Sequence, residues 1–227
     1  MTNPNRPTAP AGERIGTDTA ARFGRLALVG IALYVVLDVV AQALPPHYNP
    51  VTQAESDLAV GPYGFVMTVN FVVRGLLSLA LIAGLQRGVA PAARSRAGLV
   101  LVGVWAVGAF LLAIFPTDVG GHVTVHGAIH VVVALLAFVA GVVGEGLVAA
   151  RLGADSRWAP LRPVLLVMAV VAAVVLVALI GGNGHAVARL TGSVFGLVER
   201  VFLGLVLLWM AVAAVRLTRL PMLGEGR

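Results

Sequence analysis

Six apolar stretches, each long enough to cross a lipid bilayer, constrain this chain more than any other feature. A helix needs roughly 20 mostly apolar residues to span the hydrocarbon core of a membrane. The stretches lie near Phe23–Leu44, Tyr63–Leu85, Ala97–Phe115, Val125–Ala150, Pro163–Gly181 and Val194–Leu217. They predict an all-α, polytopic transmembrane bundle of six helices over residues 23–218. The polar residues 1–22 are expected to form a disordered cytoplasmic tail, and residues 219–227 a second, short cytoplasmic tail.

The composition supports a membrane location. Hydrophobic residues make up 59% of the chain and charged residues 11%, whereas soluble domains carry about 25% charged residues. All 16 basic residues are arginine, which together with abundant Ala, Val and Gly is typical of a GC-rich bacterial genome. The arginines are spread along the chain at helix ends, without a basic run interleaved with aromatics, so no nucleic-acid partner is expected. The absence of cysteine excludes disulfides, thiolate metal sites and a cysteine nucleophile.

The placement of the arginines predicts the topology. The loops near residues 45–62 and 116–124 contain no arginine, and the loop after Gly181 contains only Arg189. The intervening loops and both tails are rich in arginine, as the positive-inside rule requires for six spans with both termini in the cytoplasm. These features predict a multi-pass protein of the bacterial cytoplasmic membrane. A cleavable signal peptide ending near Ala41-Gln42-Ala43 is the alternative, but Asp38 and the long polar tail argue against it.

Several polar residues lie within or beside the spans, where ionisable side chains are costly and therefore candidates for function. Spacing of four residues places Asn70, Arg74 and Ser78 on one helix face. We expect two acids and two arginines to converge and neutralise each other in the outer half of the bundle. One alternative is a buried ionic network that fixes helix packing, and the other is a functional cavity open to the outer face. The candidate pocket residues are Asp38, Asp57, Asn70, Arg74, Asp118, His130, Glu199 and Arg200.

Three further features concern single helices. Glu145 lies near the cytoplasmic end of the fourth span, and its side chain is expected to extend to the membrane interface near Arg151. Small residues in the same span are expected to allow close helix packing; these are Gly141, Gly144 and Gly146. The fifth span has no ionisable side chain and is expected to face lipid, away from any site.

Histidines recur every four residues at the start of the fourth span. His122, His126 and His130 would share one helix face with Asp118, and two histidines at this spacing can bind one divalent metal such as zinc. The glutamate that follows the first histidine in many metalloproteases is absent, and Gly120 and Gly121 weaken the start of the helix. The alternative is a set of surface histidines with His130 alone buried. We expect no cofactor, and keep a zinc site at His126, His130 and Asp118 as the alternative.

Three short motifs resemble a family of prokaryotic six-helix membrane proteins known as domain of unknown function 998. They are Glu55-Ser56-Asp57-Leu58, then Phe115-Pro116-Thr117-Asp118 with His130 and an apolar run to Phe138, and finally Gly196-Leu197-Val198-Glu199-Arg200 with Trp209. The resemblance covers roughly residues 24–218 and rests mainly on the order and spacing of the motifs. It implies a fold and a membrane location, but no activity. It points to Asp57, Asp118, His130, Glu199 and Arg200, whereas His122 and His126 match no motif of the family.

The sequence therefore predicts a membrane protein, not an enzyme, with a polar pocket that binds a small molecule or a lipid headgroup. A metal-dependent intramembrane hydrolase acting on lipid is the first alternative. A small transporter is the second, although the spans show no mid-span Gly/Pro break and no internal repeat of the kind that transporters often have.

Overall fold

The computed structural model of the chain describes residues 11–120, 123–181 and 194–220, and these form helices and connecting turns without a strand. Six helices are long and apolar enough to cross a membrane, which confirms the predicted fold class. They are α1 (Ala11–Ala43), α2 (Gly64–Gly88), α3 (Arg96–Ile114), α4 (Val125–Arg151), α5 (Arg162–Gly181) and α7 (Phe195–Thr218). Short 3-10 helices occur in the links: η1 (Glu55–Ala59), η2 (Pro91–Ala93), η3 (Leu152–Ala154) and η4 (Ala159–Leu161).

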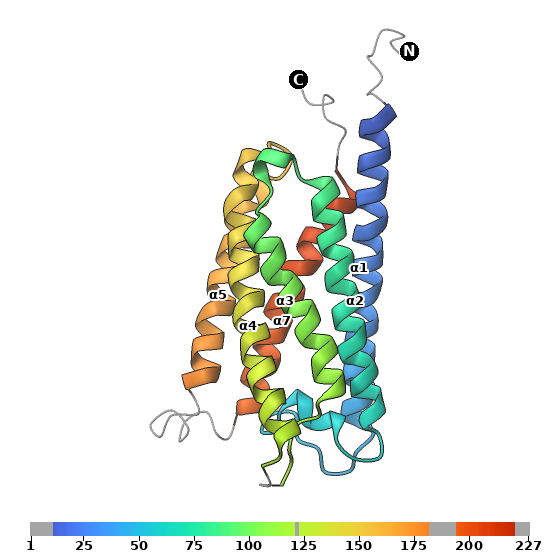
Figure 1. Ribbon diagram of the computed structural model, residues 1–227, viewed down its shortest axis with the longest axis vertical. Helices are drawn as coiled ribbons and strands as arrows, with labels where there is room; N and C mark the ends of the chain where they lie inside the picture. The colour runs from blue at the N-terminus through green and yellow to red at the C-terminus, as the bar shows by residue number, and fades with distance from the viewer. Residues whose placement is uncertain (1–10, 121–122, 182–193, 221–227) are drawn as a thin grey trace.

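The first helix begins earlier than predicted. It starts at Ala11 rather than near Phe23, so the second half of the expected disordered tail is helical. The packing of this extension gives the reason, because Ala20 is buried beside Gly84 and Gly88 of α2. This packing explains the extension around Ala20, whereas the first turns of α1 project beyond the other helices (Figure 1). Residues 1–10 and 221–227 lie outside the described residues.

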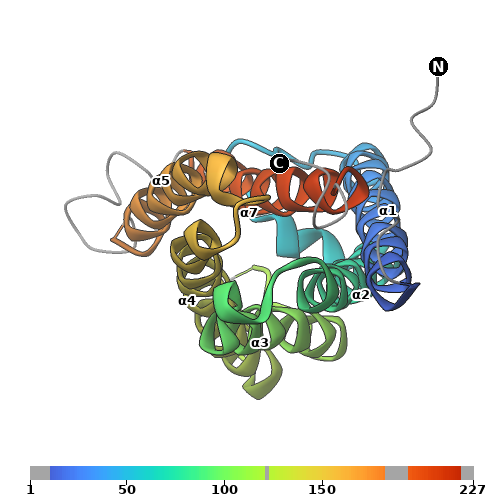
Figure 2. The same ribbon diagram turned by 90° about the horizontal axis from the view of Figure 1, so that it is seen from above.

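The six helices follow one another around a ring (Figures 1 and 2). Each packs against the helices next to it in the chain, and α7 closes the ring by packing against both α5 and α1. The link between α1 and α2 does not stay outside this ring. Its η1 segment packs against α2 and α7, and Figure 2 shows it inside the ring. The end of the bundle that holds η1 is called the η1 end below.

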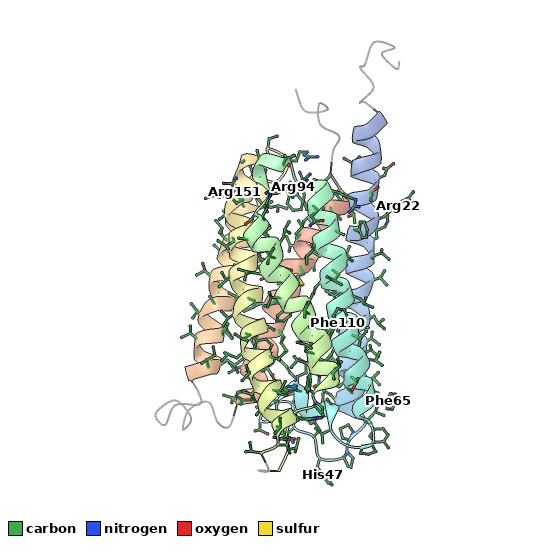
Figure 3. The ribbon with its side chains drawn as sticks, in the orientation of Figure 1. Arg22, His47, Phe65, Arg94, Phe110 and Arg151 are labelled. Atoms are coloured by element: carbon green, nitrogen blue, oxygen red, sulfur yellow. The ribbon has the colours of Figure 1, made fainter. Side chains whose placement is uncertain are left out.

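The two ends of the bundle differ in charge as the topology prediction requires. Arg22, Arg94 and Arg151 lie at the end where both described termini lie, whereas His47 lies at the η1 end (Figure 3). The arginine-rich end and the η1 end therefore form opposite ends of one bundle. The side of the membrane that each end faces stays a prediction from this asymmetry.

Glycines set the spacing between α3 and α4. A Cβ atom built at Gly144 would lie 2.9 Å from the Gly98 carbonyl oxygen and 2.9 Å from the Val102 backbone nitrogen. A Cβ atom at Gly141 would lie 2.9 Å from the Trp105 ring. At Gly146, by contrast, the nearest atom would be a methyl carbon of α5 at an ordinary 3.9 Å. Gly144 therefore allows the backbones of α3 and α4 to approach, Gly141 makes room for the Trp105 ring, and Gly146 does neither.

This contrast gives a matched pair of substitutions. Gly144→Ala should lower the thermal unfolding temperature in detergent, because backbone atoms cannot move aside as a side chain can; overpacking of this kind destabilises by about 1–3 kcal/mol. Gly146→Ala should leave the temperature unchanged or raise it, since alanine is the better helix former and has room. Equal unfolding temperatures for the two variants would contradict the close α3–α4 approach.

Candidate functional site

A cavity of about 370 Å³ lies toward the η1 end. Its wall combines a few polar side chains with many apolar ones, as is usual for small-molecule sites. Three of the predicted site residues line it, namely Arg74, His130 and Glu199, together with Glu55, which was not among them. Its apolar wall includes Phe71, Leu112, Val131, Leu135, Phe138, Leu179, Ile180 and Leu203.

The first loop forms one wall of this cavity because α7 binds it. The Glu55 backbone N–H donates to the Glu199 carboxylate over 2.6 Å. Arg200, the next residue, donates to the carbonyl oxygens of Pro50 and Gln53 over 2.9 and 3.1 Å, and it also donates to the Tyr48 hydroxyl. A loop carbonyl buried in a membrane protein needs such a donor, since lipid supplies none. Arg200 therefore positions the loop and does not line the cavity.

The start of α7 approaches the loop closely enough to require glycine. A Cβ atom at Gly196 would lie 2.7 Å from the Pro50 carbonyl oxygen, and still closer to that of Gln53. The Leu197 N–H donates to the Val51 carbonyl oxygen over 3.0 Å. Leu58 of η1 is buried in an apolar cluster with Met67 and other side chains of the same end. Backbone hydrogen bonds and apolar burial thus fix the loop from two sides.

Glu55 is the acid that this loop brings into the bundle. Its side chain is 3% exposed and accepts a hydrogen bond from the Tyr34 hydroxyl of α1. Burial, with the nearby carboxylates of Asp38 and Glu199 adding to it, raises the pKa of Glu55 to about 8. The carboxyl is consequently neutral over the lower part of the physiological pH range, and it can then donate a hydrogen bond.

Arg74 is the buried cation of the site. It is 1% exposed, and its guanidinium carbon lies 4.7 Å from the Trp105 ring centroid and 5.2 Å from that of Phe71. Its Nε and Nη2 atoms have no hydrogen-bond partner among the described residues. The predicted shared face of α2 is confirmed, since Asn70 and Ser78 are buried beside it.

His130 enters the cavity wall from the first turns of α4. Its Nδ1 lies 2.7 Å from the Phe115 carbonyl oxygen at the end of α3. A carbonyl only accepts, so Nδ1 carries a proton in this contact and Nε2 is the ring nitrogen that remains for another partner. The hydrogen bond joins the ends of α3 and α4 and fixes the orientation of the ring.

The two acids and two arginines that were expected to neutralise each other form no direct ion pair among the described residues of the η1 end. Among the described residues, the ion pair that the structure contains joins Arg157 to Asp155, 2.9 Å apart, at the arginine-rich end. At the η1 end, aromatic rings hold Arg74, and carbonyl oxygens hold Arg200. Asp38 accepts a hydrogen bond from Gln42, one turn along α1, over 2.6 Å. Helical periodicity placed these residues at one depth but did not determine their partners.

The other predicted candidates stabilise local structure. Asp57 accepts a hydrogen bond from the Ala54 N–H at the start of η1, over 3.2 Å. Asp118 accepts hydrogen bonds from the Thr124 N–H and hydroxyl, each over 2.7 Å, and so supports the start of α4. Asn70 contacts the sulfur of Met67. The residues that line the cavity do not include Asp38, Asp57, Asn70, Asp118 or Arg200.

The predicted zinc ligands His126, His130 and Asp118 lie in different structural surroundings. His126 is exposed, and its ring lies edge-on to Phe115, with 5.6 Å between ring centroids. Within the part of the chain that the structure describes, no three histidine, aspartate or glutamate side chains are grouped to hold a metal ion. His122 lies outside the described residues. The zinc site therefore stays a prediction without geometric support from His126, His130 and Asp118.

Two expectations about single helices are wrong. The Glu145 side chain does not extend to the interface, because it is fully buried and neither carboxylate oxygen has a partner among the described residues. The fifth helix does not lie away from the site, since Leu179 and Ile180 line the cavity. Both differences have the same reason: the helices form a ring, and one face of each helix points to the interior of that ring.

Sequence reasoning missed Glu55 and Tyr34 as parts of the site. Glu55 lies in a loop between two spans, and hydropathy indicates nothing about a loop that folds back between helices. One signal was present, because Glu55 is the first residue of a motif that also contains the apolar Leu58, and an apolar residue in an otherwise polar loop indicates burial. Tyr34 gave no such signal within an apolar span.

The family described as "Protein of unknown function (DUF998)" matches the chain over residues 28–216. This range contains every residue that lines the cavity and confirms the resemblance expected from the three motifs. No curated protein and no solved structure matches the chain.

The raised pKa of Glu55 predicts how stability depends on pH. In the unfolded chain this carboxyl ionises near its ordinary value of 4.5, but in the folded protein it keeps its proton to about 8. Unfolding therefore releases a proton between these values, and the contribution of Glu55 to stability decreases as pH rises from about 4.5 to about 8. Thermal unfolding in detergent at several pH values should show this decrease in the unmodified protein, on the order of several degrees.

Glu55→Gln should flatten this pH dependence, because the amide does not titrate. The matched control is Asp18→Asn, on α1 at the arginine-rich end, which should follow the unmodified protein. Parallel pH profiles for the unmodified protein and Glu55→Gln would show that Glu55 ionises normally, contrary to its burial.

Proposed function

The chain belongs to this family of unknown function, and we propose that it is a membrane protein whose cavity binds the polar head of a small acidic amphiphile. We further propose that it lies in a bacterial cytoplasmic membrane with the η1 end facing outward. The arginine asymmetry between the two ends supports this orientation.

The observation that carries the proposal is the incomplete hydrogen bonding of Arg74. A guanidinium group remains charged at every physiological pH. Leaving a buried charge without a partner destabilises a protein by several kcal/mol. Arg74 lines the cavity, and its Nε and Nη2 atoms have no partner among the described residues. A carboxylate or phosphate oxygen in the cavity would accept from these atoms in a planar, charge-assisted arrangement.

The other polar groups of the cavity are compatible with an acidic head. Glu55, neutral below a pH of about 8, can donate a hydrogen bond to it rather than repel it. With its proton on Nδ1, the neutral His130 ring has Nε2 as an acceptor, which can contact a hydroxyl group of the head but not its charged oxygens. An anion would thus find one permanent cation and one neutral donor, and the hydroxyl groups of Ser56 and Thr117 line the same wall. The Glu199 carboxylate, which also lines it, already accepts a hydrogen bond from the Glu55 backbone N–H.

The shape of the wall supports an apolar body attached to that head. Val131 and Leu135 of α4 line the cavity and are also 62% and 42% exposed on the surface of the helix ring. Ile180 of α5 shares both properties. These three side chains therefore mark an entrance between α4 and α5, on the surface that faces lipid in a membrane. We infer that the ligand enters from the bilayer, with its tail against these residues.

A binding role fits this geometry better than the hydrolase considered from the sequence. A metal-dependent hydrolase needs His126 and His130 with an acid within ligand distance. Here His126 is exposed and Asp118 supports the start of α4. No specific observation favours a transporter.

Three probes that share one alkyl chain test the proposal: decanoate, decanol and decyltrimethylammonium. Added below its micelle-forming concentration to the protein in a mild detergent, decanoate should raise the thermal unfolding temperature in a saturable way. Decanol should have a weaker effect, because its hydroxyl oxygen accepts from Arg74 without carrying a charge. Decyltrimethylammonium should have none, because it has no acceptor and repels the guanidinium.

Two variants and a control complete this experiment. Arg74→Gln should abolish the decanoate effect. Val131→Trp should block the entrance and so abolish the decanoate effect. Because position 131 is exposed and tolerates a larger side chain, this variant should fold, and it tests the proposal even if Arg74→Gln does not fold. Arg22→Gln, which removes an exposed charge at the opposite end, should retain the decanoate effect. An equal response to the cationic probe, or a retained response in Val131→Trp, would contradict the proposal.

A further inference from the structure

A second cavity, of about 680 Å³, lies at the opposite end of the bundle from the first. It lies between the last turns of α2, the η2 link and the first turn of α3, and is called the arginine groove here. Three arginines line it, Arg87, Arg94 and Arg96, and among the described residues no acidic side chain does. Three cations that share one concavity, with no counter-charge from the described part of the chain, favour an anionic occupant.

Each arginine of the groove keeps guanidinium N–H groups that can donate to a further partner. Arg94 uses its Nε to donate to the Val89 carbonyl oxygen over 2.7 Å, which fixes the base of its side chain. Arg87 lies over the Phe23 ring, 5.2 Å from its centroid, and is exposed. Arg96 is exposed, and no hydrogen bond or ion pair joins it to another described residue. The planar end groups can therefore form bidentate contacts with phosphate oxygens.

The floor of the groove is rigid because the α4–α5 link holds η2. Asp155 accepts a hydrogen bond from the Ala90 N–H over 2.9 Å. The Trp158 indole donates to the Gly88 carbonyl oxygen over 3.1 Å, and Arg151 donates to that of Ala92 over 2.8 Å. Burial opposes ionisation of Asp155, but hydrogen bonds from Arg157 and Ala90 outweigh it and lower its pKa. Asp155 is thus already paired and does not compete for the groove arginines.

Apart from Gln86, the remainder of the groove is apolar and continues onto the outer face of α3. Ile82, Leu99 and Val100 line it, and Val100 is 65% exposed. Val104 and Val107 extend this exposed line along α3, at the spacing of one helix face. The cationic part thus lies at the end of a span, and the apolar part follows the span into the region that lipid would fill.

We propose that the arginine groove binds the phosphate headgroup of an anionic phospholipid, with an acyl chain along the Val100 face of α3. A free anion would use the arginines but not the apolar wall, which is why a lipid fits the groove better. This site is separate from the proposed amphiphile cavity and does not depend on it.

Native mass spectrometry of the detergent-solubilised protein tests this proposal. The probes are phosphatidylglycerol and phosphatidylcholine with identical acyl chains, and inorganic phosphate. Phosphatidylglycerol should bind more tightly than phosphatidylcholine. Replacement of all three groove arginines (R87Q/R94Q/R96Q) should weaken its binding on the order of a hundredfold, since each basic residue near an anionic surface contributes roughly a fivefold gain.

The matched control, R22Q/R25Q/R162Q, removes the same charge from the same end outside the groove and should bind phosphatidylglycerol normally. Val131→Trp should also bind it normally, which separates the groove from the amphiphile cavity. If the triple groove variant does not fold, Arg96→Gln alone should still show a weakening of several fold, because Arg96 is exposed and no hydrogen bond or ion pair joins its side chain to another described residue. Equal binding of the two lipids, equal loss in both triple variants, or binding of inorganic phosphate alone as tight as that of the lipid would overturn the proposal.

Discussion

The structure of the η1 end depends on the hydrogen bonds between the start of α7 and the loop that joins α1 to α2. Glu199 accepts from the Glu55 backbone, and Arg200 donates to the carbonyls of Pro50 and Gln53. Without these contacts, a stretch of loop backbone would lie inside a helix ring with unpaired polar groups. The same contacts turn the Glu55 side chain toward the cavity, so one pair of adjacent residues closes the bundle and completes the wall of its polar site.

The three motifs that resemble the family acquire a common physical meaning from this arrangement. The first contributes η1, with Glu55 in the cavity wall and Leu58 in the apolar cluster beneath it. The second contributes the Phe115 carbonyl, which binds His130. The third contributes Gly196 and the Glu199–Arg200 pair, which receive the loop. Segments far apart in the sequence therefore meet at one end of the ring, around the cavity.

Most of the fold was predictable from hydropathy, because lipid allows a chain few structures other than helices. The individual partners were not. Arg74 was predictable as buried, but its stacking on Trp105 depends on how α2 and α3 approach each other. Glu145 was expected at the interface because a single sequence does not reveal which face a neighbouring helix covers. Glu55 escaped prediction as a site residue because a loop that folds inward leaves no periodic signal.

In the proposed function, the cavity beside Arg74 holds the acidic head of an amphiphile that enters between α4 and α5. An experimental map of the protein in lipid nanodiscs tests it most directly. If the amphiphile binds as proposed, the map contains elongated non-protein density from the Val131 entrance to the cavity, with its head within hydrogen-bond distance of the Arg74 guanidinium. A map in which Arg74 pairs directly with Glu55 or Glu199, and side chains fill the cavity, would contradict it.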